Sequence, residues 1–277
     1  MAKALVLGGG GVAGIAWETG VLFGLREAGL DLTDADLLVG TSAGSVVAAQ
    51  VATGLPASLM YDRQITVSPF TEKAVDFDVE AMGARYIEML ADRPPPEELR
   101  RRVGAWAQQA DTVPEAERLA IIGTRLPVQE WPERVLQIAA VDATTGGFVV
   151  FDRDSGVGLV DAVAASCAVP GVWPPVTIGS RRYIDGGVRS IVNADLAAGY
   201  EQVIVVAPMT VGIGGDVSRE CETLRAGGSH VALIVADEPS VAAFGSNPLD
   251  PSTRAPSAEA GRVQAAAVLD AAAEVWR

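Results

Sequence analysis

Short apolar runs alternate along this chain with longer segments of helical periodicity, a pattern typical of helices layered on a mostly parallel sheet. Continuous apolar runs indicate buried strands, because parallel strands are covered on both faces. The expected strands cover 4–7, 37–39, 134–141, 148–151, 176–178, 182–184, 203–207 and 231–236. The expected helices cover 15–28, 46–52, 79–91, 97–110, 114–123, 159–168 and 257–276. No repeat or linker divides the chain, so we predict a single α/β domain over residues 1–277.

A long helical stretch separates the second expected strand from the third. Its pattern, over about 55–132, is interrupted by Pro94-Pro95-Pro96 and by Pro114. Proline ends helices because it has no amide to donate. An ordinary helical layer and a cap over a functional site both fit such an insertion, and we describe it as cap-like.

A Gly-x-Ser-x-Gly motif, Gly40-Thr41-Ser42-Ala43-Gly44, stands between an apolar strand and a helix of small residues. In a strand–turn–helix context such a motif turns sharply and exposes its serine, and the small Gly40 and Gly44 permit the turn. Ser42 is therefore a candidate nucleophile at a helix N-terminus. The alternative is a polar turn in which Ser42 or Ser45 caps the helix.

A glycine-rich loop, Gly8–Gly14, follows the first expected strand and exposes backbone amides that can hold an anion. It matches the dinucleotide fingerprint at Gly9, Gly11 and Gly14, but the second strand does not end in the acidic residue that binds ribose. A P-loop needs Lys and then Ser or Thr after the last glycine, where Ile15-Ala16 stand. The third interpretation is an oxyanion hole beside Ser42.

A nucleophilic serine needs a base, and the chain has one histidine, His230. The order Ser, Asp, His of α/β-hydrolases is available, but His230 directly precedes a strand and Ser42 follows only two strands. Asp185 is the other candidate, since it ends a strand before Gly186-Gly187. Burial raises the pKa of a carboxyl and makes it a stronger base, although an Asp-Gly pair is also a common turn.

Together these motifs resemble the patatin-like phospholipase family. The resemblance covers the glycine loop, the Ser42 motif, and the stretch Asp161–Pro175 that leads to Asp185-Gly186-Gly187. It implies a three-layer α/β fold with a mostly parallel central sheet, and a lipid acyl hydrolase that uses a Ser-Asp dyad without a cofactor. By similarity Ser42 is the nucleophile and Asp185 the base. The amides of Gly9, Gly10 and Gly11 form the oxyanion hole, and the remaining motif glycines are Gly14, Gly40, Gly44, Gly186 and Gly187.

Two positions depart from the family pattern. The family usually carries Arg or Lys before the last loop glycine, where this chain has Ala13, and the segment Ile15–Thr19 is one residue longer than usual. If the basic residue orients an anionic headgroup, its replacement favours a simple ester over a phospholipid. The identity of the acyl substrate therefore stays open at this stage.

The net charge of the chain limits the kinds of molecule it is expected to bind. The chain has 21 basic and 35 acidic residues, a net charge of −14, with no basic cluster. Nucleic acid and electrostatic capture by anionic lipid are disfavoured, so contact with a lipid surface should be transient and apolar, through Trp173 or the cap. No cluster of metal ligands is evident, and we expect no metal or organic cofactor.

The two cysteines, Cys167 and Cys221, have no metal-like or redox spacing, which favours a reducing, cytoplasmic environment over a disulfide framework. The apolar N-terminus is interrupted by Gly8–Gly11 and does not fit a signal peptide. No apolar stretch reaches the ~18 residues of a membrane span. The leading hypothesis is a serine lipid acyl hydrolase; the alternative is a nucleotide-binding or regulatory α/β protein that uses Gly9–Gly14.

Overall fold

The computed structural model describes residues 1–66, 79–212 and 214–277. Within these residues eight strands form a central sheet, ordered β10-β7-β1-β2-β3-β6-β5, with β4 paired to β3. The strands are β1 (Lys3–Leu7), β2 (Leu37–Gly40), β3 (Val135–Asp142), β4 (Phe148–Phe151), β5 (Val176–Ile178), β6 (Arg181–Asp185), β7 (Gln202–Ala207) and β10 (His230–Val235). From β10 to β3 neighbouring strands are parallel, whereas β4, β5 and β6 pair antiparallel. A separate hairpin joins β8 (Val211–Gly212) and β9 (Gly215–Asp216).

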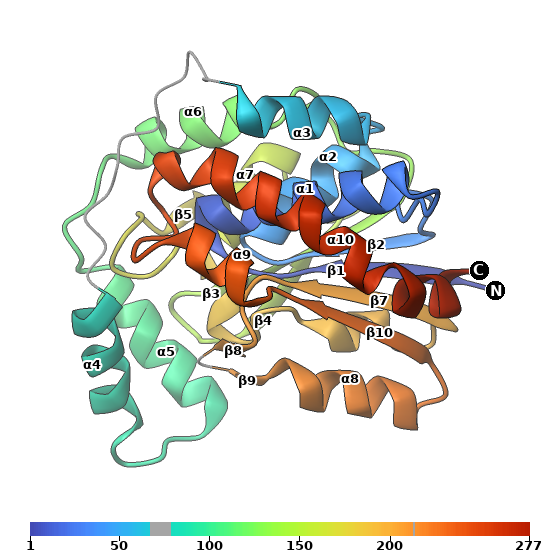
Figure 1. Ribbon diagram of the computed structural model, residues 1–277. Coiled ribbons are helices and arrows are strands. Elements are labelled where there is room, and N and C mark those ends of the chain that lie inside the picture. The colour runs from blue at the N-terminus through green and yellow to red at the C-terminus, as the bar shows by residue number, and fades with distance from the viewer. Residues whose placement is uncertain (67–78, 213) are drawn as a thin grey trace.

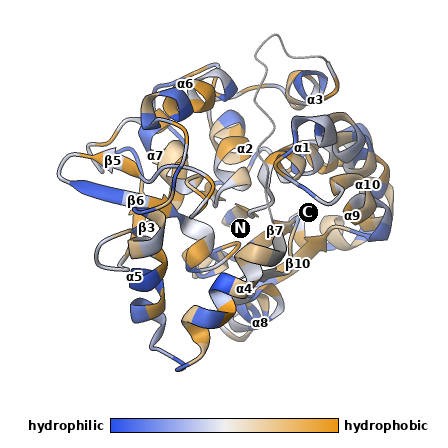
Figure 2. Ribbon diagram, turned by 90° about the vertical axis from the view of Figure 1, so that its left-hand side faces the viewer, coloured by the Kyte–Doolittle hydropathy of each residue, from blue (hydrophilic) through white to orange (hydrophobic). Residues whose placement is uncertain are grey.

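Helices cover both faces of this sheet (Figure 1). They are α1 (Gly11–Glu27), α2 (Ala43–Ala52), α3 (Ala57–Ile65), α4 (Val79–Leu90), α5 (Pro96–Ala107), α6 (Glu115–Arg125), α7 (Leu159–Ser166), α8 (Val217–Ala226), α9 (Glu238–Phe244) and α10 (Arg254–Trp276). Figures 1 and 2 show α10 and α8 on opposite sides of β7 and β10. The expected α/β fold, with a mostly parallel sheet between helices, is confirmed.

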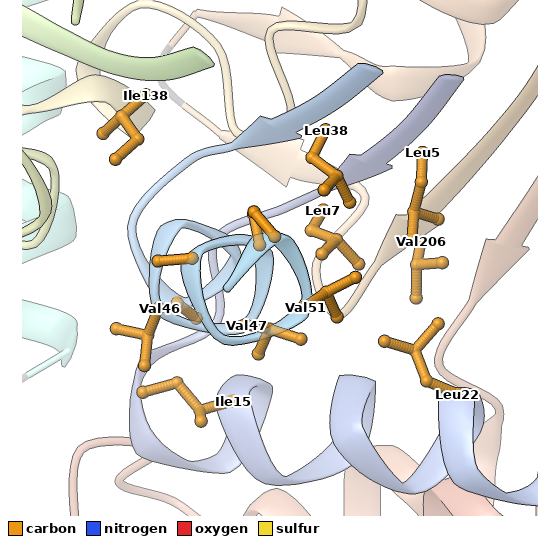
Figure 3. Close-up of a cluster of buried hydrophobic side chains, with 14 of the residues drawn as sticks. Leu5, Leu7, Ile15, Leu22, Leu38, Val46, Val47, Val51, Ile138 and Val206 are labelled. Atoms are coloured by element: carbon orange, nitrogen blue, oxygen red, sulfur yellow. The ribbon is translucent and has the colours of Figure 1, made fainter. Parts of the chain in front are cut away.

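Side chains of each central strand alternate between two cores. Leu5 and Leu7 belong to a large core with α1, α2, α7 and α10, whereas Ala4 and Val6 belong to a smaller core with α8. Figure 3 shows Leu7 and Val206 of the strands directed toward the helices of the large core. Since successive strand residues point to opposite faces, a continuous apolar run is what a strand buried on both sides requires.

The structure corrects the expected bounds at the glycine loop. Helix α1 begins at Gly11, not at residue 15, so the loop spans only Gly8–Gly10 and Gly14 lies inside the helix. Helix α2 likewise begins at Ala43, directly after Ser42, and not at residue 46. Both changes place a helix N-terminus closer to the candidate nucleophile.

Three helices were not expected from the sequence, namely α3, α8 and α9. Helix α8 is rich in charged residues, and its inward face consists of Val217, Cys221 and Leu224. These three residues, spaced i, i+4 and i+7, form an apolar stripe too narrow to stand out in the sequence, so the helix was not predicted. In the expected insertion the structure describes α3, α4, α5 and α6, while residues 67–78 lie outside the described residues; its role as a cap stays a prediction. No helix in the described ranges has the length and apolar character to cross a membrane.

Candidate active site

The Ser42 turn is held in a conformation that its glycines make possible. Ser42 joins β2 to α2 with φ 52° and ψ −116°, a region that non-glycine residues rarely occupy. A Cβ on Gly44 would lie 2.1 Å from the Leu7 carbonyl oxygen, and one on Gly40 would lie 2.5 Å from the Ser45 Cα. Both glycines are therefore needed for the close approach of loop, strand and helix. The strained serine matches a nucleophile elbow.

The end of α7 fixes this turn through residues that the sequence did not single out for the purpose. The Ser42 amide donates to the Ser166 hydroxyl at 2.9 Å, and the Cys167 thiol donates to the Ser42 carbonyl at 3.2 Å. The Ser45 hydroxyl donates to the same carbonyl at 2.6 Å. Ser42 makes no side-chain capping bond. The interpretation of Ser42 or Ser45 as a simple helix cap is therefore wrong, and the Ser42 hydroxyl is left available for chemistry.

Asp185 ends β6 beside the Ser42 turn, and its amide donates to the Ala168 carbonyl at 3.0 Å. Its Oδ1 accepts the Gly187 amide at 2.7 Å, whereas the buried Oδ2 has no hydrogen-bond partner among the described residues. Burial raises the pKa of Asp185 to about 7, against the lowering effects of the Ser42 hydroxyl, the Gly187 amide and Arg118. The carboxyl thus interacts with Ser42 and keeps one oxygen unsatisfied, as a proton acceptor requires.

The two glycines after Asp185 have separate structural reasons. A Cβ on Gly186 would lie 2.4 Å from the Ala139 carbonyl oxygen of β3. A Cβ on Gly187 would lie 2.9 Å from Asp185 Oδ1, the atom that the Gly187 amide binds. Gly186 therefore allows the chain to pack closely against β3, and Gly187 orients the Asp185 carboxyl. An ordinary Asp-Gly turn needs neither contact.

Three amides at two adjacent helix N-termini are available to an oxyanion. Three amides have no acceptor among the described residues: those of Gly10, which precedes α1, of Gly11, its first residue, and of Ala43, the first residue of α2. Gly11 has φ +66°, which favours glycine. Gly9 differs from the expectation, because its amide already donates to the Ile191 carbonyl at 2.8 Å. A Cβ on Gly9 would lie 2.6 Å from Ile191 Cδ1, so this residue serves close packing beneath Ser42.

Gly14 allows two helices to pack closely, and the surroundings of the glycine loop do not support the nucleotide-binding alternative. A Cβ on Gly14 would lie 3.3 Å from the Ala43 Cβ, so Gly14 lets α1 and α2 approach closely. The Ala13 amide donates to the Pro248 carbonyl at 2.9 Å, and a Cβ on Gly11 would lie 2.8 Å from the same oxygen. The segment at Pro248 therefore covers the loop from outside, where a phosphate cradle would have to be open.

A buried carboxyl supports the glycine loop from below. Glu18 of α1 is fully buried, and its Oε1 accepts the Gly8 amide at 2.8 Å. Burial raises the pKa of Glu18 well above its ordinary value, although the bond from Gly8 lowers it. Glu18 belongs to the segment Ile15–Thr19. A carboxylate directly after the apolar residues Ile15, Ala16 and Trp17 was the sequence signal that could have identified it.

A small cavity of about 20 Å³ adjoins Ser42, room for about one water molecule. Its lining includes Gly11, Ser42, Arg118, Arg125 and Trp173. The Arg118 guanidinium stacks on the Trp173 ring, 3.7 Å from its centroid. Ala13 is fully buried in the large core, so positive charge at this site comes from α6 and not from the glycine loop.

Trp173 is only 4% exposed beneath Arg118. Its expected contact with a lipid surface is therefore wrong for this conformation, because the ring is already covered on the face that the guanidinium occupies. Contact through the helical insertion stays a prediction.

His230 lies at the amino ends of the parallel strands, whereas Ser42 lies at their carboxyl ends. It begins β10 and pairs with Gln202, which in turn pairs with Lys3 at the amino end of β1. Ser42 follows the carboxyl end of β2, level with the last residues of β10. At ~3.3 Å per residue the two side chains are separated by roughly 15 Å along the strands alone. The Ser-Asp-His interpretation is therefore wrong.

Over the described part of the chain, no group of three or more His, Cys, Asp or Glu residues is arranged to hold a metal ion. Cys167 and Cys221 are buried free thiols. Burial raises the pKa of Cys167 to about 11, so it serves as a neutral donor to Ser42.

Comparisons with known proteins show to which family this chain belongs. A family model described as patatin-like phospholipase matches residues 5–198. Comparison with curated proteins finds no matching relative. Among solved structures, VipD from Legionella pneumophila is 14% identical with a TM-score of 0.49, over 98% of this chain and 67% of that one. The type III effector ExoU is 17% identical with a TM-score of 0.40, over 95% of this chain and 53% of that one. This chain thus spans about two thirds of the VipD chain and about half of ExoU. Because the family model covers more than half of the sequence, the chain belongs to the patatin-like phospholipase family.

Proposed function

We propose that this protein hydrolyses carboxylic esters of acyl lipids, with Ser42 as nucleophile and Asp185 as the base. The family implies lipid acyl hydrolysis. The observation that carries the residue assignment is the buried Asp185 carboxyl, whose pKa is raised to about 7 and which interacts with the Ser42 hydroxyl. An ordinary aspartate, with a pKa of about 3.9, is a weak base for a hydroxyl, and the raised pKa strengthens it near neutral pH.

The reaction proceeds through an acyl-enzyme. Ser42 Oγ bonds to the ester carbonyl carbon while its proton passes to Asp185 Oδ2. The oxyanion is stabilised by the amides of Gly10, Gly11 and Ala43, which need no reorganisation. The carbon–oxygen bond to the leaving alcohol then breaks, and the alcohol takes the proton from Asp185. Water then attacks the acyl carbon while Asp185 takes a proton from it. The bond from this carbon to Ser42 Oγ breaks, Ser42 Oγ takes the proton back from Asp185, and the fatty acid is released.

The charge beside Ser42 favours a substrate with an anionic group close to its ester. Arg118 and Arg125 of α6 both line the cavity next to Ser42. Guanidinium groups bind phosphate and carboxylate oxygens well. Phospholipids and lysophospholipids carry a phosphate near the scissile ester, so we propose this class over neutral acylglycerols.

The cavity that described residues line beside Ser42 has a volume of about 20 Å³, smaller than an acyl ester. Helix α6 carries both arginines and lies within the expected cap-like insertion. We propose that α6 shifts away from Ser42 when a lipid binds.

The decisive test is ester hydrolysis by the wild type and three variants, each first shown to be folded by thermal unfolding. The substrates are p-nitrophenyl butyrate and a lysophospholipid. Ser42→Ala and Asp185→Asn should lose activity on both substrates. His230→Ala should keep it, because His230 lies at the opposite end of the strands from Ser42. An inactive His230→Ala would contradict the dyad. A wild type inert on both substrates would remove the proposed function.

A further inference from the structure

A groove of about 670 Å³ lies between α5 and α8. These two helices cover the face of the sheet opposite α10 (Figure 1). None of its lining residues lines the cavity beside Ser42. Its volume falls within the ~300–1,000 Å³ of typical small-molecule sites. The apolar part of the lining includes Leu90, Pro94, Leu99, Val188 and Leu224. This groove is therefore large enough, and apolar enough, to hold a ligand of its own.

Most charges along the groove are already compensated. Both guanidinium Nη atoms of Arg189 donate to Asp195, at 2.8 and 2.7 Å, and its face lies 4.0 Å from the Phe148 ring centroid. Glu220 accepts the Ala194 amide at 2.9 Å through one oxygen and the Ser190 hydroxyl through the other. These groups form a satisfied polar rim that leaves no carboxylate oxygen for a cation.

Arg100 is the exception. Its Nε donates to the Gly146 carbonyl at 2.6 Å, but its Nη atoms have no hydrogen-bond acceptor and no ion pair in the described ranges. Burial and the positive charge of Arg189 lower the pKa of Arg100. The exposed Glu97 raises it, but its effect is the smallest of the three. Two guanidinium groups thus approach each other, and only one has its anion. An anion placed in the groove would relieve this repulsion.

We propose that the groove binds a small amphipathic anion, with its carboxylate or phosphate on the Nη atoms of Arg100 and its apolar body against Leu99, Val188 and Leu224. The planar guanidinium matches two oxygens of such a group. The single uncompensated charge selects a monoanion, and the apolar walls select an aliphatic body over inorganic phosphate. The site is separate from Ser42, and the proposal depends on no catalytic assignment.

The test is isothermal titration calorimetry of the full chain with decanoate, decyl phosphate, decanol and inorganic phosphate. Arg100→Gln is compared with Arg101→Gln, a matched control on the same helix whose exposed arginine pairs with Glu98 at 2.7 Å. Loss of charge-assisted hydrogen bonds should weaken the amphipathic anions by about tenfold or more in Arg100→Gln, and Arg101→Gln should match the wild type. Decanol and inorganic phosphate should bind more weakly than either amphipathic anion.

A second pair of variants separates binding in the groove from a folding defect. Thr223 lines the groove and its neighbour Glu222 does not. Thr223→Trp should block decanoate without loss of thermal stability, whereas Glu222→Trp should leave binding unchanged. Equal affinity of wild type, Arg100→Gln and Thr223→Trp, or no binding of either amphipathic anion to the wild type, would overturn the proposal. The outcome does not depend on ester hydrolysis.

Discussion

Removing the charge of Asp185 should make the protein more stable and inactive. The side chain is 5% exposed, and burial is the main cause of its raised pKa. Asp185→Asn keeps the shape of the neutral carboxyl, including an oxygen to accept the Gly187 amide, and removes the ionisation. We predict a higher free energy of unfolding than wild type at pH 8, together with complete loss of ester hydrolysis.

The magnitude follows from linkage between protonation and folding. The pKa is raised from an ordinary value of 3.8 to about 7. Between these values the folded protein holds a proton that the unfolded chain has released, so this group makes stability fall as pH rises. A shift of about three pKa units at ~1.36 kcal/mol each gives an upper limit of about 4 kcal/mol at pH 8. The advantage of Asp185→Asn should shrink through pH 6 and vanish near pH 4.

Urea denaturation at pH 4, 6 and 8 measures this difference. Asp142→Asn is the matched control, since this buried carboxyl also ends a strand but has the opposite shift. Burial raises the pKa of Asp142, but the amides of Thr145 and Thr144, the Thr145 hydroxyl and Arg181 together lower it below the ordinary value. Its charge therefore stabilises the fold above pH ~4, and Asp142→Asn should be destabilised at pH 8. Asp185→Asn less stable than wild type at pH 8, or a gain independent of pH, would refute the reasoning.

Four further measurements test the site. For wild type, kcat/KM should rise with pH to a plateau with a midpoint of about 7, set by Asp185, and His230→Ala should give the same profile; a flat profile from pH 5 to 9 contradicts this. Gly44→Ala should fail to fold or lose several kcal/mol, because its Cβ would lie 2.1 Å from the Leu7 oxygen, whereas Gly83→Ala in α4 has nothing within 4 Å and should gain up to about 1 kcal/mol in thermal unfolding. Ser166→Ala should lower kcat about tenfold at unchanged KM, since the Ser42 amide loses its acceptor; an unchanged kcat would show that the turn holds without it. Arg118→Gln and Arg125→Gln should reduce kcat/KM for a lysophospholipid more than for p-nitrophenyl butyrate, and equal losses would argue against an anionic substrate.

The sequence predicted the parts of the site whose constraints are local. Gly40, Gly44 and Gly186 each face a backbone atom closer than any Cβ tolerates, so a strand–turn–helix pattern with glycine at these places carries real steric information. Asp185 could be singled out as a candidate because it stands at the carboxyl end of a strand, directly before two glycines, where functional side chains are often found.

Contacts between distant segments were beyond the sequence. Ser166 and Cys167 hold the Ser42 turn across more than 120 positions, and no periodicity encodes such a pairing. The sequence analysis did not single out Arg118, because it is one of several charges on an amphipathic helix. Only the packing of α6 brings it onto Trp173. Gly9 was grouped with its neighbours as an amide donor because the partner of its amide, Ile191, lies far along the chain.

Two buried carboxyls show why a shifted pKa does not by itself identify a base. Burial raises the pKa of both Glu18 and Asp185. Each has one oxygen bound to a glycine amide and one without a hydrogen-bond partner among the described residues. Glu18 lies inside α1, and the one hydrogen bond of its side chain among the described residues comes from the Gly8 amide, so it supports the glycine loop. Asp185 interacts with the hydroxyl of Ser42, whose strained turn is fixed by Ser166 and Cys167. The same physical cause therefore yields a structural support in one place and a proton acceptor in the other, and the difference is made by the side chain opposite.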